Sequence, residues 1–215
     1  NVSVGDEGGF APKLENNNQP LEFMNRAIEE AGYKKGEEVS CGVDAAASSF
    51  FKKEEGQYLF KPENTALSRE MLINIYNEWI GKYNVISIED GLEEDDWEGW
   101  AIMNAKLGEK TVQIGDDLLV TNVKRLKTAI EKKACNAVLI KVNQIGSLTE
   151  TIDCIKLAKK NKMKTVISHR SGETTDDFIS DLAVAAGADY MKSGSLSRGE
   201  RICKYNRLLR IEEEL

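Results

Sequence analysis

The fold is decided by the stretch Ala137-Val138-Leu139-Ile140-Lys141-Val142-Asn143-Gln144-Ile145-Gly146. Its apolar run predicts a strand over residues 137–142 that is buried on both faces, as strands of parallel sheets are. Lys141 lies inside that run, and a buried ammonium group costs free energy unless it is paired. Taken alone, the lysine is interpreted as a side chain that reaches water at the strand end. Whether Lys141 has a structural or a functional role therefore depends on which residues the other strands carry at the corresponding position.

The pattern of an apolar strand followed by an amphipathic helix recurs along the chain. Strands are predicted at residues 39–44, 85–89, 111–116, 164–168 and 188–192. Helices are predicted at residues 20–31, 68–83, 95–107, 122–133, 175–186 and 198–210, and one more after a capping box formed by Ser147 and Glu150. Residues 50–62, with polar and aromatic residues around Gly56, are predicted to form a small hairpin or an excursion from the βα pattern. Repeated βα units favour a TIM-type (β/α) barrel over an open doubly wound sheet, because no G-x-G-x-x-G follows a strand.

Six strands are predicted, whereas a closed barrel of this type has eight. Residues 1–5 are a further candidate that is too short to interpret as a strand. We therefore expect residues 1–215 to be one α/β domain, an incomplete barrel with about six of its eight strands. The chain begins with Asn1 rather than methionine, and we expect it to be a piece of a longer protein.

Composition excludes several classes of protein. The chain has 215 residues with 36 acidic and 29 basic side chains, a net charge of -7 and no basic stripe, which argues against a nucleic-acid-binding protein. No apolar run approaches the roughly 18 residues of a membrane span. The four cysteines are scattered without a CxxC pair, which is typical of reduced packing residues and favours a cytoplasmic location.

Each predicted strand ends at or beside an ionisable residue. These residues are Asp44, Glu89, Asp116, Lys141, His169 and Lys192. A single strand-end carboxylate would be interpreted as a helix cap, but six ionisable groups in phase with the βα units are not explained by capping. Because the carboxyl ends of barrel strands meet at one face, where active sites are found, the pattern predicts a shared site.

The acids and the lysines suit different tasks. Asp44, Glu89 and Asp116 are hard oxygen ligands of the kind that Mg²⁺ prefers. A single histidine and scattered cysteines make a zinc site a poor fit. Lys141 and Lys192 are candidates for a base, since a lysine near another cation gives up its proton more readily.

The segment His169-Arg170-Ser171 predicts an anion site. A planar guanidinium fork and a hydroxyl group suit a phosphate or a carboxylate, although His169 alone is equally well interpreted as a structural histidine. A magnesium site, a lysine base and an anion clamp together predict proton abstraction next to a carboxylate. Such a reaction needs its enolate charge spread over a metal and nearby cations.

Six motifs follow one another along the chain: Gly5-Asp6-Glu7-Gly8-Gly9-Phe10-Ala11-Pro12, Ser87-Ile88-Glu89-Asp90, Gly115-Asp116-Asp117-Leu118, Leu139-Ile140-Lys141-Val142-Asn143-Gln144-Ile145-Gly146, Ser168-His169-Arg170-Ser171-Gly172-Glu173-Thr174 and Lys192-Ser193-Gly194. Together they closely resemble the enolase family, and the resemblance spans essentially the whole chain. It implies the reversible Mg²⁺-dependent dehydration of 2-phosphoglycerate to phosphoenolpyruvate, a carbon–oxygen lyase reaction of glycolysis and gluconeogenesis.

The resemblance also implies a role for each candidate residue. Lys141 corresponds to the base that removes the C2 proton of the substrate, and Glu7 to the acid that protonates the leaving C3 hydroxyl. The implied Mg²⁺ ligands are Asp44, Glu89 and Asp116. The implied substrate contacts are Arg170 and Ser171 at the phosphate, Lys192 at the enolate, and His169.

The family's barrel has the order ββαα(βα)₆. The resemblance therefore implies that residues 1–215 are a C-terminal barrel domain shortened at its N-terminal side, without the α+β capping domain. It implies a cytoplasmic homodimer for the whole protein and an inactive fragment for the barrel alone. One position departs from the family pattern, since Ser49 stands where the family has a glutamate that supports the strand ending at Asp44.

Two alternatives stay open at this point. The first is another magnesium-dependent enzyme of the enolase superfamily that abstracts a proton next to a carboxylate, against which the segment His169-Arg170-Ser171 argues. The second is a non-catalytic binding module, which no basic patch supports.

Overall fold

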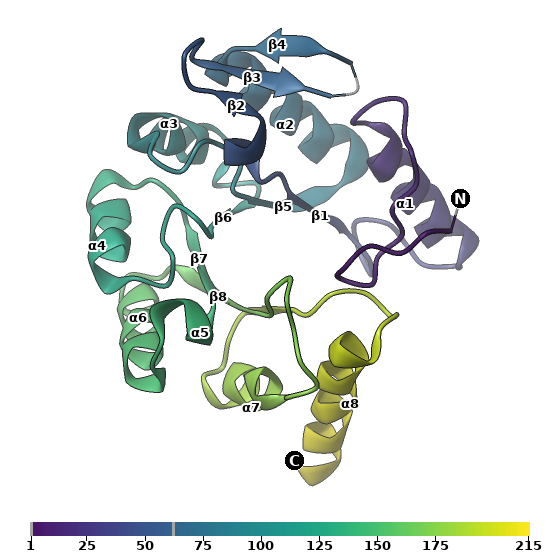
Figure 1. The fold of residues 1–215 in the computed structure, drawn as a ribbon, viewed down its shortest axis with the longest axis vertical. Coiled ribbons are helices and arrows are strands. Elements are labelled where there is room, and N and C mark those ends of the chain that lie inside the picture. The colour runs from purple at the N-terminus through teal and green to yellow at the C-terminus, as the bar shows by residue number, and fades with distance from the viewer. Residues whose placement is uncertain (1, 62) are drawn as a thin grey trace. The chain divides into compact units, whose positions relative to one another are not determined.

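The chain divides into two units in the computed structural model, which describes residues 2–61 and 63–215 and leaves Asn1 and Pro62 outside. Unit 1 consists of Asn1–Lys13, Leu119–Leu126 and Ala137–Leu215, and unit 2 of Leu14–Leu118 and Lys127–Asn136. Each unit contains three parallel strands with helices between them (Figure 1). The predicted α/β class is therefore confirmed within each unit.

The parallel strands of unit 2 are β1 (Cys41–Asp44), β5 (Val85–Glu89) and β6 (Val112–Gly115), in this order. Its helices are α1 (Gln19–Glu30), α2 (Arg69–Tyr83) and α3 (Trp97–Leu107). Helix α2 packs against β5 and contacts both other helices. Its buried Leu72 and Tyr76 share the core with Ile88 of β5 and Trp100 of α3.

A small antiparallel sheet follows β1 after the 3-10 helix η1 (Ala47–Phe50). Its strands are β2 (Phe51–Lys52), β3 (Gln57–Phe60) and β4 (Thr65–Leu67). The pair β2–β3 confirms the predicted hairpin, whose last residue, Pro62, lies outside the described residues. Strand β4 was not predicted, because three residues carry no readable period. Helix α2 contacts β3 and β4 (Figure 1).

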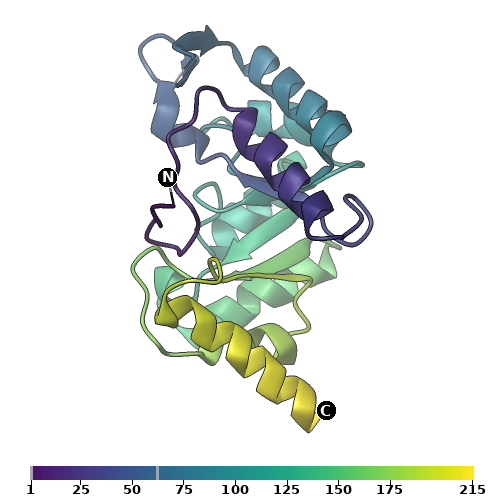
Figure 2. The ribbon, with the colours of Figure 1, turned by 90° about the vertical axis from the view of Figure 1, so that its right-hand side faces the viewer.

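Unit 1 contains β7 (Ala137–Ile140), β8 (Lys164–Ser168) and β9 (Tyr190–Lys192) as neighbours in that order. Its helices are α5 (Val142–Ile145), α6 (Leu148–Lys160), α7 (Phe178–Ala185) and α8 (Gly199–Glu214). All four residues of β7 are buried, as predicted. Helix α6 packs on β7 and β8, and α7 on β8, β9 and α8. Figure 2 shows α8 as the long yellow helix that leads to the C-terminus. The residues of α4 (Val123–Lys132) are divided between the units.

The strand that opens the sequence argument is shorter than predicted. It ends at Ile140, and Lys141 is the N-cap residue of the one-turn helix α5. The turn closes because Gly146 adopts φ +102° and its N–H donates to the carbonyl oxygen of Val142 at 2.9 Å. Lys141 therefore lies at the strand end and not within the buried run.

The amino-terminal candidate strand is replaced by a loop. Among the described residues, a single bridge joins Val4 to Phe10, and the N–H of Gly5 donates to the carbonyl oxygen of Gly9 at 2.9 Å. None of the described helices is both long enough and apolar enough to cross a membrane.

The serine cap of the predicted capping box is present at the start of α6, and the Glu150 carboxylate binds the Ser147 hydroxyl. The Ser147 hydroxyl accepts the N–H of Glu150 at 3.3 Å and donates to the Glu150 carboxylate at 2.6 Å. We expect Ser147→Ala to lower the free energy of unfolding by about 1 kcal/mol, because the first turn of α6 loses this acceptor. The measurement is urea unfolding followed by circular dichroism. Ser147→Asn keeps a capping acceptor and serves as the control, so equal losses in both variants would contradict the capping role.

Candidate functional site

The acidic candidates lie at one end of the parallel strands of unit 2. Asp44 and Glu89 end β1 and β5 and are register partners, and Glu89 pairs in turn with Ile114 of β6. Asp116 follows β6 directly after Gly115. Glu89 and Asp116 are buried, whereas Asp44 is exposed. The structure thus places the three predicted acidic residues at one end of these strands.

Asp90 is a buried acid at this end that the sequence interpretation did not use. Its two carboxylate oxygens accept the N–H groups of Asp116 and Asp117, each at 2.9 Å. One carboxylate oxygen from each of these three residues lies within 4.8 Å of the others, and we call this group the acid cluster. The sequence did contain a signal for Asp90. It is a second acid directly after the strand-end Glu89, just as Asp117 directly follows Asp116 after β6.

Burial raises the pKa of Asp90 to about 7. The N–H groups of Asp117 and Asp116 oppose this shift, while the charges of those two side chains add to it. A bound cation would favour the ionised form of all three acids. Hard carboxylate oxygens gathered at one sheet end fit the ligand preference of Mg²⁺.

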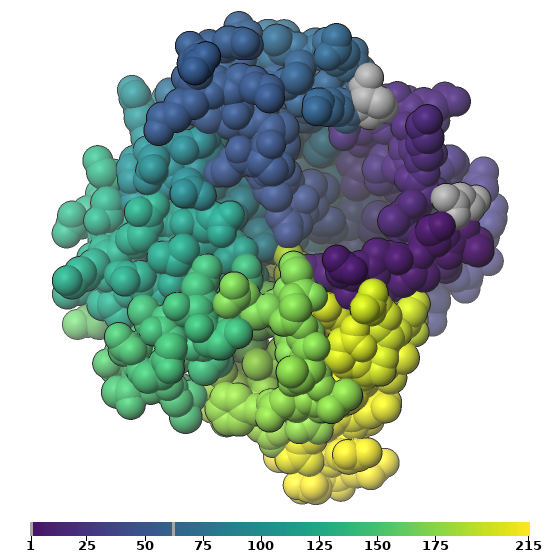
Figure 3. Space-filling model, in the orientation of Figure 1, coloured from purple at the N-terminus to yellow at the C-terminus, as the bar shows by residue number. Residues whose placement is uncertain are grey.

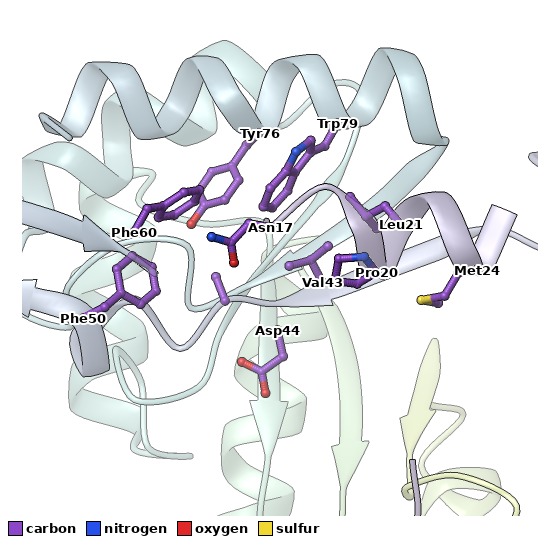
Figure 4. Close-up of a pocket in the computed structure, with 12 residues that line it drawn as sticks. Asn17, Pro20, Leu21, Met24, Val43, Asp44, Phe50, Phe60, Tyr76 and Trp79 are labelled. Carbon is purple, nitrogen blue, oxygen red and sulfur yellow. The ribbon is translucent and has the colours of Figure 1, made fainter. Parts of the chain in front are cut away.

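A cavity of about 320 Å³ lies beside β1 in unit 2 (Figure 4). Its walls are mainly aromatic and aliphatic: Leu21, Met24, Val43, Phe50, Phe60, Tyr76 and Trp79. Asp44 borders the cavity, but its carboxylate points away from the aromatic side chains (Figure 4). Such walls do not replace the hydration of a phosphate group, so this cavity does not suit an anionic substrate.

Glu7 is carried by the N-terminal loop of unit 1. Its carbonyl oxygen accepts the N–H of Ser195 at 2.8 Å, and the carbonyl oxygen of Gly8 accepts the hydroxyl of Ser197 at 3.0 Å. Gly8 has φ +83°, and a Cβ atom there would collide with the Ser197 carbonyl group. The backbones of these two segments therefore approach closely only because residue 8 is glycine. Figure 3 shows the purple N-terminal residues against the yellow C-terminal ones.

The Glu7 carboxylate meets two candidates from the loop after β8. The Ser171 hydroxyl donates to Glu7 Oε1 at 3.1 Å, and His169 Nε2 lies 3.4 Å from Glu7 Oε2. Glu7 is partly exposed, whereas His169 is 2% exposed. Folding of unit 1 thus brings together three of the candidates that the sequence predicts to share a site.

The remaining candidates of unit 1 lie around the same loop. The N–H of His169 donates to the carbonyl oxygen of Lys192 at 3.0 Å, and Arg170 Nη1 donates to Asn143 Oδ1 at 2.9 Å. Lys141 follows β7, and its N–H donates to the Thr121 hydroxyl at 2.9 Å. The order β7-β8-β9 therefore places both lysines and His169 at one end of this sheet.

His169 is neutral at physiological pH. Burial lowers its pKa to about 4; the charge of Glu7 opposes the shift, and the charges of Arg201 and Lys192 add to it. A neutral imidazole has one donor and one acceptor nitrogen, so its hydrogen-bond partners decide its tautomer.

Two buried cations of α8 were missed by the sequence interpretation. Arg201 binds carbonyl groups of the loops around Glu7 and Ser171, and the Lys204 ammonium lies 3.5 Å from the Glu173 carboxylate. A signal was available, because residues 201, 204 and 208 share one face of the predicted helix. Arg201 and Lys204 lie on the same helix face as the apolar Leu208, and a basic residue on an apolar helix face indicates a buried charge.

One family model matches the chain. It is described as "Enolase, C-terminal TIM barrel domain", and it matches residues 1–215. This match confirms both the predicted barrel class and the family resemblance of the six motifs.

The raised pKa of Asp90 predicts a pH dependence of stability. Between about pH 4 and pH 7 the unfolded chain releases this proton while the folded chain keeps it, so the contribution of Asp90 to stability falls as the pH rises and then levels off. In metal-free buffer we expect wild type to lose up to about 4 kcal/mol relative to Asp90→Asn over this window, since each pKa unit corresponds to about 1.4 kcal/mol.

Urea unfolding at a series of pH values measures this difference. The control is Asp181→Asn, because Arg207 holds the pKa of Asp181 below its usual value and outside the window. A wild-type to Asp90→Asn difference that stays constant from pH 4 to pH 8 would contradict the raised pKa.

Proposed function

Because the chain belongs to the enolase C-terminal TIM barrel family, we propose that it supplies the catalytic residues for the reversible Mg²⁺-dependent dehydration of 2-phosphoglycerate to phosphoenolpyruvate. The observation that supports this best is the meeting of Glu7, His169 and Ser171 in unit 1. An acid, a neutral imidazole and a hydroxyl group beside a guanidinium suit a phosphorylated substrate with a leaving hydroxyl.

In this proposal Lys141 removes the proton from C2 of the substrate. It lies directly after the fully buried strand β7, and the bond from its N–H to Thr121 holds its backbone in place. Lys192 ends β9 and contributes positive charge, which stabilises the negative charge that develops as the proton leaves.

Glu7 protonates the leaving C3 hydroxyl group. The hydroxyl of Ser171 donates to its carboxylate, which orients the acid toward the loop that binds the phosphate. Arg170 and Ser171 contact the phosphate group, and Asn143 orients the Arg170 fork. His169 completes the substrate site as a neutral side chain.

Asp44, Glu89 and Asp116 are proposed to hold Mg²⁺. When bound, the ion supplies positive charge that stabilises the enolate oxygens of the reacting carboxylate. Their location at one end of three neighbouring strands supports this ligand set. The acid cluster is a second possible ligand set that shares Asp116. From the family resemblance we also propose a cytoplasmic homodimer.

We expect Lys141→Ala to lower kcat by about 10² to 10⁴ fold, because the reaction loses its general base. The measurement uses the complete protein encoded by the gene, with Mg²⁺ and 2-phosphoglycerate, and follows the ultraviolet absorbance of the enol product. Lys164→Ala is the matched control, since Lys164 is an exposed lysine that opens β8 and contacts Tyr190. Turnover that survives Lys141→Ala unchanged would remove lysine 141 from the mechanism. Turnover of other carboxylates only would favour the superfamily alternative.

Two further variants separate the two ligand sets. We expect Asp44→Asn to weaken Mg²⁺ binding about tenfold or more and Asp117→Asn to leave it nearly unchanged, because only Asp44 belongs to the proposed set. Isothermal titration of the chain with Mg²⁺ measures both, and Asp116→Asn, which removes a ligand shared by both sets, is the positive control. The reverse pattern would assign the ion to the acid cluster.

A further inference from the structure

The guanidinium group of Arg201 lies inside unit 1, where the residue is 1% exposed. Nη1 donates to the carbonyl oxygen of Arg170 at 2.7 Å, and Nη2 donates to those of Asp6 at 3.0 Å and Ser171 at 2.8 Å. A charge is tolerated in the interior only where hydrogen bonds replace its hydration. These carbonyl groups therefore allow an arginine at this position, and the arginine in turn holds their loops together.

A further partner of Arg201 is the His169 ring. Nη1 of Arg201 lies 2.6 Å from Nδ1 of His169. A guanidinium group has only donors and stays protonated throughout the pH range of proteins, so Nδ1 must be the acceptor. An accepting Nδ1 carries no proton, and a neutral imidazole must then carry its proton on Nε2.

The protonated nitrogen lies beside the proposed acid. Nε2 of His169 is 3.4 Å from Glu7 Oε2, and within residues 2–61 and 63–215 it has no hydrogen-bond partner. The groups that face the ring are the cations Arg201 and Lys192 and the acids Glu7 and Glu173. If Nδ1 carried the proton, it would need a hydrogen-bond acceptor. Among the described contacts, none of these four groups accepts a hydrogen bond from Nδ1, whose partner is the Arg201 donor.

We propose that Arg201 is a positioning residue that fixes His169 in the tautomer with its proton on Nε2, the ring nitrogen that lies 3.4 Å from the Glu7 carboxylate. Arg201 acts through the ring and through the three carbonyl groups that it binds. The Nε2–H of His169 then lies beside the Glu7 carboxylate, and the ring does not take up a proton near pH 7, because its unprotonated nitrogen is covered by the guanidinium group. The tautomer follows from the geometry of unit 1 alone, and its importance for proton transfer at Glu7 rests on the proposed function.

The chain offers an unusually direct test, because His169 is its only histidine. Labelling with [¹⁵N]histidine and recording long-range ¹H–¹⁵N spectra reports the protonation of one ring. At pH 7 we expect a protonated Nε2 and a bare Nδ1, with no imidazolium form until the pH falls toward the pKa of about 4. An Nδ1–H tautomer, or an imidazolium ring at pH 7, in the wild-type chain would overturn the proposal.

Variants assign the effect to Arg201. Arg201→Met keeps the length of the side chain without its donors, and we expect a mixture of tautomers and a His169 pKa closer to the usual value. Arg201→Lys keeps a charged donor and should restore the Nε2–H form. Arg207→Met is the matched control, because it removes a guanidinium group of the same helix that pairs with Asp181.

An unchanged ring spectrum in a folded Arg201→Met chain would overturn the proposal. If that variant does not fold, the wild-type tautomer and its retention in Arg201→Lys decide the question. None of these spectra depends on turnover. A failed tautomer test would therefore leave the proposed reaction standing, and absence of 2-phosphoglycerate turnover would leave the tautomer result standing.

Discussion

The replacement of hydration around buried charges is the constraint on which the candidate site depends, and Arg201 is its clearest case. Its guanidinium group is removed from water, so carbonyl groups of the chain must take the place of water molecules. Those carbonyl groups belong to Asp6 and to the loop after β8. Unit 1 cannot bury Arg201 in this way without bringing the loop of Glu7 to the loop of Ser171.

Asp90 is the acidic counterpart in unit 2. Its carboxylate accepts two backbone N–H groups after β6, as the Arg201 guanidinium donates to backbone carbonyl groups in unit 1. In both places a buried ionisable group organises backbone at a strand end and leaves neighbouring side chains available for chemistry. The cost is visible in the raised pKa of Asp90 and the lowered pKa of His169, because each neighbourhood disfavours one charged form.

Elements with a strong local signal were predicted well. The apolar strands β5 and β8 and the serine cap of α6 depend on a few neighbouring residues, which the sequence displays directly. Errors arose where a residue suits two states. Lys141 was predicted inside a strand but caps α5, because the positive φ of Gly146 lets the chain turn at once. The acids of the proposed magnesium site were found because they recur at the ends of the predicted strands. Asp90 was missed because its hydrogen-bond partners are backbone N–H groups, which the sequence does not display.

By itself the sequence determined the type and order of the parallel strands and of the longer helices, the family, and the recurrence of ionisable residues at strand ends. These properties depend on residue type and spacing, which need no coordinates. Only the tertiary structure decided which charges are buried and what each of them binds, since desolvation and hydrogen-bond direction have no local pattern in the chain. Glu7 meets His169 and Ser171 only in folded unit 1. The tautomer of the single histidine likewise follows from one buried guanidinium group that spacing alone could not place beside it.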